Sequence, residues 1–117
     1  MADTYIVAEI GTGHQGDLRR AEELIAAARD SGADCAKFQW VIADEIVHPQ
    51  TGNVALPGGE TPLYERFREL EQPAEFYQTL AELCDHAGID FLCTPFGLES
   101  ARQLRARNPR AIKIASP

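Results

Sequence analysis

The chain has 117 residues, of which 44% are hydrophobic and 25% are charged, the composition of an ordinary globular domain. No apolar run approaches the roughly 20 residues of a membrane-spanning helix, and the N-terminus lacks the features of a signal peptide. We therefore expect a cytoplasmic protein with no membrane partner. The net charge of −7 argues against a nucleic-acid partner, because phosphate backbones are bound by net basic surfaces.

The first half of the chain predicts strand, helix, strand and a long loop. Residues 5–10 (YIVAEI) are apolar and β-branched, and Gly11 stops them. Asp17 is placed to cap the following helix, which we expect to end at residues 31–32. Residues 35–41 (CAKFQWV) predict the second strand. Residues 42–60 contain many turn formers and predict a long loop.

The second half continues the alternation. Thr61 is a candidate cap for a short helix that ends near residue 70, with proline at its first helical position. Pro73 opens a longer helix that runs to His86. Strands at residues 89–94 and 111–115 then flank a helix over residues 98–107.

This alternation predicts a parallel sheet covered by helices, either doubly wound or a (β/α)₈ TIM barrel. Four strands are about half of a barrel that needs roughly 250 residues. We therefore expect residues 1–117 to be the N-terminal half of a barrel domain, in about four βα units and apparently truncated. Four strands leave two open sheet edges, so a chain of this length is predicted to be unstable or to self-associate.

Polar side chains interrupt these apolar strands near their carboxyl ends. They are Glu9, Lys37, Gln39, Thr94, Lys113 and Ser116. Ligands of parallel α/β folds bind at this edge of the sheet. Lys37 and Gln39 lie two residues apart and therefore share one face with Cys35. Two lysines on the concave side indicate an anionic ligand, although Lys37 could instead pair with Glu9 on the neighbouring strand.

The three cysteines, Cys35, Cys84 and Cys93, form neither a disulfide framework nor a CxxC motif. Cys35 and Cys93 lie in apolar runs and are expected to be small buried residues. His14 is expected to order the loop after the first strand or to lie beside a substrate. Its role as a metal ligand is the weaker alternative.

The segments AEIGTGHQGD, AKFQ, TPLYE, FLCTPF and KIAS occur in this order. Together they resemble the N-terminal part of the N-acylneuraminate (sialic acid) synthase family, whose usual forms are close to AEIGxNHxGD, VKFQ, STPF and KIxSGE. The resemblance extends from Tyr5 to Ser116. It implies a TIM barrel followed by a small domain that caps the site of the partner subunit in a homodimer.

The resemblance also implies the reaction. Phosphoenolpyruvate condenses with N-acetylmannosamine or a related amino sugar, and phosphate is released. Lys37, Lys113 and Ser116 would contact the phosphate or carboxylate of phosphoenolpyruvate. Gln39, Thr94 and the candidate catalytic residue Glu9 would lie near the sugar and the reacting carbons. The family uses a divalent metal, Mn²⁺ or Mg²⁺, whose ligands are expected outside this chain, so these residues alone should have no synthase activity.

Two alternatives remain open at this point. One is a Schiff-base aldolase of the TIM-barrel class, with Lys37 or Lys113 as the nucleophile. The other is a non-catalytic module that binds a sugar phosphate. Trapping with pyruvate and borohydride separates the aldolase from the synthase, because only the aldolase forms a stable lysine adduct.

Overall fold

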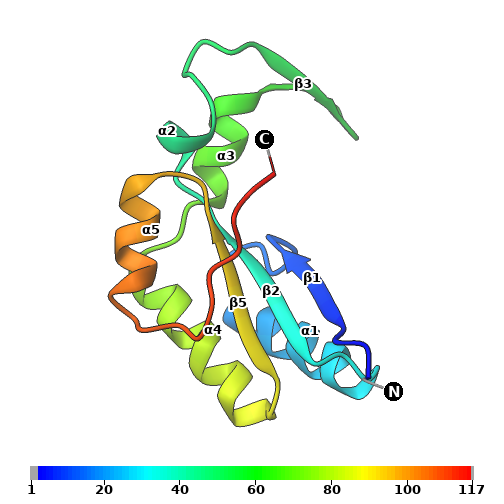
Figure 1. Cartoon of the computed structure of the whole chain (residues 1–117). Coiled ribbons are helices and arrows are strands. Elements are labelled where there is room, and N and C mark those ends of the chain that lie inside the picture. The colour runs from blue at the N-terminus through cyan, green and yellow to red at the C-terminus, as the bar shows by residue number, and fades with distance from the viewer. Residues whose placement is uncertain (1–2, 117) are drawn as a thin grey trace.

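The computed structural model describes residues 3–116, which form a parallel sheet, a separate hairpin and five helices (Figure 1). In chain order the elements are β1 (Val7–Gly11), α1 (Leu18–Asp30), β2 (Cys35–Trp40), α2 (Ala43–Ile46), β3 (Asn53–Leu56), β4 (Gly59–Pro62), α3 (Leu63–Leu70), α4 (Ala74–Ala87), β5 (Asp90–Pro95) and α5 (Leu98–Arg105). No helix of this part of the chain combines the length and the apolar character required to cross a membrane.

The main sheet has the strand order β1-β2-β5, and both pairs of strands are parallel. Glu9 is the register partner of Lys37, and Gln39 is the partner of Thr94. Side chains of register partners lie on the same face of a sheet. The polar residues of the three strands therefore share one face, as the alternation in the sequence predicts.

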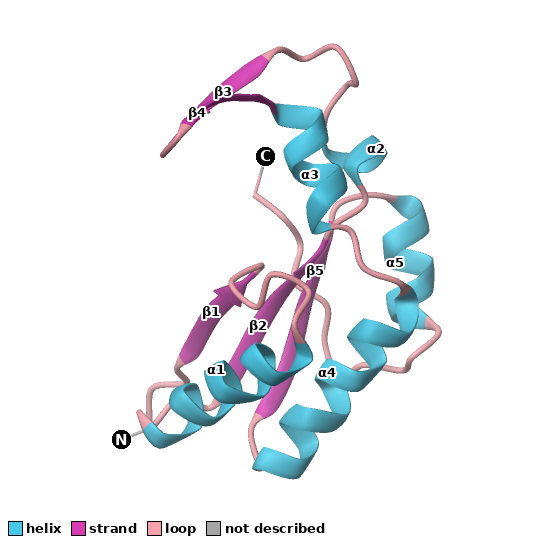
Figure 2. Cartoon of the chain, turned by 180° about the vertical axis from the view of Figure 1, so that it is seen from behind, coloured by secondary structure: helices cyan, strands magenta, loops and turns pink. Residues whose placement is uncertain are grey.

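The helices α1, α4 and α5 cover the opposite face, which is turned toward the viewer in Figure 2. Ala36, Phe38 and Trp40 of β2 are buried against this helical layer. The ring of Trp40 stacks on Tyr77 of α4 at a centroid distance of 4.1 Å. The core thus lies on one side of the sheet and leaves the polar face open.

Helix boundaries follow the local signals closely. Asp17 caps α1 as predicted, since its Oδ1 accepts hydrogen bonds from the backbone N–H groups of Arg19 (2.9 Å) and Arg20 (3.3 Å). Pro73 is the N-cap of α4, and Gly88 ends that helix in the left-handed region at φ 73°. Both residues act where the sequence places them.

The connection between β2 and α3 differs from the predicted loop. It contains the one-turn helix α2 and the antiparallel hairpin β3–β4, which stand beyond the carboxyl ends of the main strands (Figure 1). The prediction of Thr61 as a helix cap is wrong, because Thr61 pairs with Val54 in the hairpin. Helix α3 therefore begins after Pro62, which has no side-chain hydrogen bond to offer.

The predicted fourth strand, residues 111–115, is also wrong as a strand. The segment is extended beside β5, and one main-chain hydrogen bond, from Lys113 N to Cys93 O (3.1 Å), connects the two. A ladder needs repeated bonds, and among the described residues no strand lies on the other side of this segment to hold it flat.

Candidate active site

The centre of the open face is an ion pair between neighbouring strands. Nζ of Lys37 on β2 contacts Oε2 of Glu9 on β1. The Lys37 side chain is 21% exposed and the Glu9 side chain 45%. A pair with this much solvent contributes at most about 1 kcal/mol to stability. The contact does, however, hold an ammonium and a carboxylate together at a surface that ligands can reach.

Gly11 lets a second polar side chain approach this pair. Its φ of +58° is in the left-handed region, and a Cβ at this position would lie 2.9 Å from Oε1 of Glu9 and 3.8 Å from Nε2 of Gln39. The side chains of Glu9 and Gln39 therefore both lie against the bare backbone of Gly11. Glycine is needed here both for the backbone conformation and for the close approach.

Thr94 extends the polar face to the third strand. It is nearly fully buried at the end of β5, beside its register partner Gln39. Glu9, Lys37, Gln39 and Thr94 thus form a continuous polar group across β1, β2 and β5, in which a cation, a carboxylate, an amide and a hydroxyl face the same side.

Within residues 3–116, no hydrogen bond or ion pair joins the side chains of Lys113 and Ser116 to this group. The backbone of Lys113 is fixed next to Thr94 by the bond to Cys93 O, but its Nζ bonds to the carbonyl of Ile114. Ser116 is exposed near the end of the described chain. Four of the six predicted residues are therefore brought together. The other two lie on a segment that, among the described residues, has a single main-chain bond to the sheet, from Lys113 N to Cys93 O.

His14 lies inside the molecule, next to Phe38 on the helix-covered side of the sheet. It is 1% exposed and packs against Phe76, with ring centroids 4.9 Å apart. Its Nδ1 accepts a hydrogen bond from the backbone N–H of Gly16 (3.0 Å), which closes the loop after β1. Burial lowers the pKa of His14. Among the described residues, its Nε2 has no hydrogen-bond partner.

All three cysteines are buried and free, including the two for which this was predicted. Burial raises the pKa of the Cys84 and Cys93 thiols to about 12 and also raises that of Cys35. Thiols with such pKa values stay protonated near neutral pH and are poor nucleophiles.

The side chains present do not fit a divalent metal. Within residues 3–116, no group of three or more His, Cys, Asp or Glu side chains could hold an ion. The carboxylate at the site, that of Glu9, is held by the ammonium of Lys37, which repels a cation. The chemistry of these residues is therefore that of an ammonium, a carboxylate and two uncharged polar groups.

Two residues on the connections that follow β2 and β5 have no counterpart in the sequence-based prediction. Ser100 is fully buried at the start of α5, and its hydroxyl donates a hydrogen bond to the carboxylate of Glu45 on α2. The two residues are far apart in the sequence, so no local pattern relates them. The one local signal is Gly97 at the N-cap of α5. Because glycine has no side chain to cap the helix, it indicates that the cap comes from elsewhere in the chain.

Comparisons with known proteins show which family this chain resembles. Residues 24–117 match the model of the NeuB family. The chain is 36% identical over 116 residues to N,N'-diacetyllegionaminic acid synthase of Legionella pneumophila, and the alignment covers 96% of this chain and 33% of that protein. The chain therefore spans about a third of the length of the curated relatives that it matches.

The chain is also similar to solved structures. Spore coat polysaccharide biosynthesis protein SpsE of Bacillus subtilis has a TM-score of 0.72 and 34% identity, over 98% of this chain and 30% of that one. The sialic acid synthetase of Leptospira borgpetersenii has a TM-score of 0.79 over 97% of this chain and 36% of that one, at 24% identity, which shows a shared fold alone. The predicted fold class, the N-terminal portion of a (β/α)₈ barrel, is confirmed. Together with the family match over most of its residues, this shows that the chain belongs to the NeuB family.

Proposed function

We propose that this chain forms the phosphoenolpyruvate side of a synthase site, at which phosphoenolpyruvate condenses with an N-acyl amino sugar to give a sialic-acid-type nonulosonic acid and phosphate. The supporting observation is the Glu9–Lys37 pair on the open face of the sheet, beside Gln39 and Thr94, in a chain of the NeuB family.

Lys37 is suited to bind the anionic substrate. An ammonium carries three donors, so Lys37 can keep Glu9 and still donate to a phosphate or carboxylate oxygen. Lys113 and Ser116 lie on the extended segment beside β5 and would add a second cation and a hydroxyl to the same anion. These contacts would orient C3 of phosphoenolpyruvate toward the sugar aldehyde.

Glu9 is suited to the proton transfers. Attack by C3 forms the new carbon–carbon bond, and the aldehyde oxygen takes up a proton. Water then adds at C2 and loses a proton before the bond from C2 to the phosphate oxygen breaks. A carboxylate held in place by Lys37 can accept that proton or orient the sugar carbonyl.

The same ion pair argues against the Schiff-base alternative at Lys37. A Schiff base requires Nζ to attack a carbonyl carbon, and Nζ of Lys37 is already held by Oε2 of Glu9. Lys37 and Lys113 are the two lysines of the sequence, so the chemistry of each can be followed individually.

Mass spectrometry of lysine acylation tests the proposal. Phosphoenolpyruvate should protect Lys37 and Lys113 from acylation at concentrations at which inorganic phosphate does not, because it offers a carboxylate as well as a phosphate. Borohydride reduction with pyruvate should leave both lysines unmodified. Equal protection by phosphate and phosphoenolpyruvate, or a reduced pyruvate adduct on either lysine, would contradict the proposed function.

A further inference from the structure

The N-terminus of α5 is capped by a carboxylate from another element. Oε1 of Glu45 on α2 accepts hydrogen bonds from the backbone N–H groups of Glu99 (2.7 Å) and Ser100 (3.1 Å). A helix normally receives this cap from its own N-cap residue. In α5 the N-cap is Gly97, and a Cβ there would lie 2.5 Å from Cδ of Glu45. The Glu45 side chain therefore occupies the space of the absent cap.

Ser100 extends this contact back toward β5. Its hydroxyl donates to Oε2 of Glu45 and accepts from the backbone N–H groups of Phe96 (3.2 Å) and Gly97 (3.3 Å). One carboxylate and one hydroxyl thus satisfy the N–H groups of Phe96, Gly97, Glu99 and Ser100. The whole turn between β5 and α5 depends on this pair.

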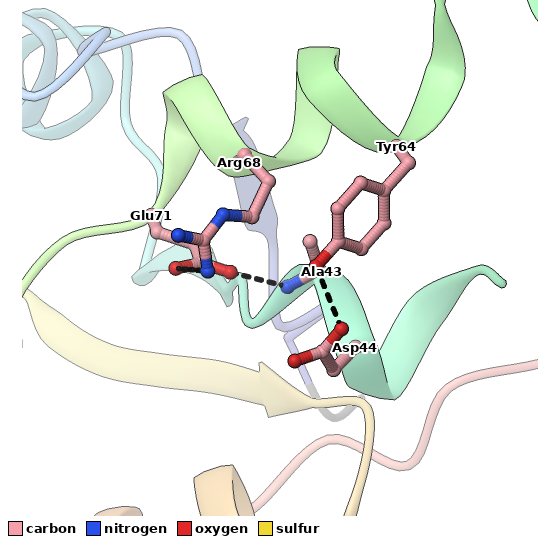
Figure 3. Close-up of polar contacts among 5 residues, drawn as sticks. All are labelled: Ala43, Asp44, Tyr64, Arg68 and Glu71. Carbon is pink, nitrogen blue, oxygen red and sulfur yellow. Dashed lines mark hydrogen bonds and ion pairs between the residues drawn. The ribbon is translucent and has the colours of Figure 1, made fainter. Parts of the chain in front are cut away.

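The helix that carries Glu45 is itself fixed on its other side. Oε1 of Glu71 accepts from the backbone N–H of Ala43 (2.7 Å), and Tyr64 OH donates to Oδ1 of Asp44 (2.8 Å) (Figure 3). Arg68 pairs with the second oxygen of Glu71 at 3.4 Å. Helix α2 is therefore held between α3 and α5, with Glu45 on the side that faces α5.

These contacts join the connections that follow two site residues. Helix α2 follows β2, which carries Gln39, and Ser100 follows β5, which carries Thr94. Gln39 and Thr94 are register partners at the ends of these strands. The Glu45–Ser100 contact therefore ties the β2 connection to the β5 connection, at the edge of the sheet where the candidate site lies.

We propose that Glu45 is a positioning residue of the candidate site. By capping α5 from α2 it locks the β2 and β5 connections together and keeps Gln39 and Thr94 in one fixed arrangement toward the ligand. We call this tie between the β2 and β5 connections the lock. Its effect on ligand affinity rests on the proposed function, while the lock itself is a property of the fold.

Three variants of Glu45 separate its cap of α5 from the lock between the β2 and β5 connections. Glu45→Ala removes both the cap and the lock. The double variant Glu45→Gly, Gly97→Asp restores a cap from within α5, because glycine at position 45 vacates the space that the new aspartate needs. It does not restore the connection to α2. Glu45→Gln keeps an oxygen acceptor for both N–H groups and serves as the conservative control.

Two measurements on the full chain are compared across these variants. Amide hydrogen exchange of Glu99 and Ser100 reports the cap and should accelerate roughly fivefold or more in Glu45→Ala and recover in the double variant. The phosphoenolpyruvate concentration that half-protects Lys37 from acylation reports the site. It should rise about 2- to 30-fold in both Glu45→Ala and the double variant, and it should stay near the original value in Glu45→Gln.

Recovery of protection together with the cap in the double variant would show that Glu45 is only a cap and would overturn the proposal. If phosphoenolpyruvate fails to protect Lys37 in the unmodified chain, the proposed function fails, and exchange of the residue 41–47 amides then decides the lock. Faster exchange in the double variant supports the lock, and an unchanged rate overturns it.

Discussion

At the scale of single residues, the candidate site depends on one position without a side chain. Gly11 combines a positive φ with contact to Glu9 and Gln39, so it determines how closely the carboxylate and the amide can approach. Gly32 differs, because it has a φ of +89° but no heavy atom within 4 Å of the point where a Cβ would lie. Comparing substitutions at the two positions therefore distinguishes the cost of backbone strain, which both share, from the effect on the site, which only Gly11 has.

We predict that Gly11→Ala and Gly32→Ala each lower the free energy of unfolding by about 1–2 kcal/mol, the usual cost of a left-handed alanine. Gly11→Ala alone should also displace the Glu9 carboxylate and expose Lys37. Urea unfolding measures the first effect and the rate of Lys37 acylation the second. Equal acylation rates in the two variants would show that Gly11 does not control the ion pair.

His14 makes stability depend on pH. Burial places its folded-state pKa below the ordinary value of about 6.5. Below that pH the unfolded chain binds the proton more readily than the folded chain, so the unfolded state is favoured. The contribution of neutral His14 to the free energy of unfolding is therefore complete above about pH 6.5 and is lost as the pH falls through the folded-state pKa.

We therefore predict a lower urea midpoint at about pH 5.5 than at about pH 7.5, and a smaller difference in His14→Asn, whose side-chain oxygen can still accept from Gly16. His48→Asn is the matched control, because His48 accepts the same kind of bond from Gln50 in an exposed loop. Acid sensitivity that persists unchanged in His14→Asn would assign it to other groups.

At the scale of elements, the connection between β2 and α3 has two parts with different roles. Helix α2 is held by Glu71, buries Ala43 and carries Glu45. The hairpin β3–β4 is mostly exposed, and the bond from Leu63 N to Gly52 O (2.9 Å) closes its base. The first part supports the sheet edge, and the second contributes little to the core.

Replacing residues 54–61 with two glycines should therefore change the free energy of unfolding by less than about 0.5 kcal/mol, because little apolar surface is lost. Glu71→Ala should cost about 1 kcal/mol, since it removes the cap of α2. Chemical denaturation compares the two. A larger loss from the shortened hairpin than from Glu71→Ala would reverse the roles assigned to these parts.

At the scale of the whole molecule, both edges of the main sheet are open within the described residues. Tyr5 and Ile6 just before β1 and Val7 at its start are exposed, and Ile114 beside β5 is 76% exposed. Unpaired backbone groups next to exposed apolar side chains form a template for further strands.

A polypeptide of these 117 residues is accordingly predicted to self-associate with increasing concentration in sedimentation velocity experiments. Ile114→Lys should weaken the association, because a charged side chain disfavours edge pairing. Leu98→Lys, at a similarly exposed apolar position on helix α5, should have a smaller effect. A single monomeric species at all concentrations, or equal effects of the two variants, would contradict this prediction.

The sequence by itself determined the elements whose signals are local. The alternation of Cys35–Trp40 assigned Lys37 and Gln39 to one face, and Asp17, Pro73 and Gly88 marked helix ends, because caps and strand faces depend on residues a few positions away. The motif series indicated the family. Only the tertiary structure decided the pairing of Glu9 with Lys37, which the sequence left as one of two options, and the capping of α5 by Glu45. It also decided that residues 111–115 form no ladder. Each of these depends on which distant segments meet, and contacts of that kind carry no local signature.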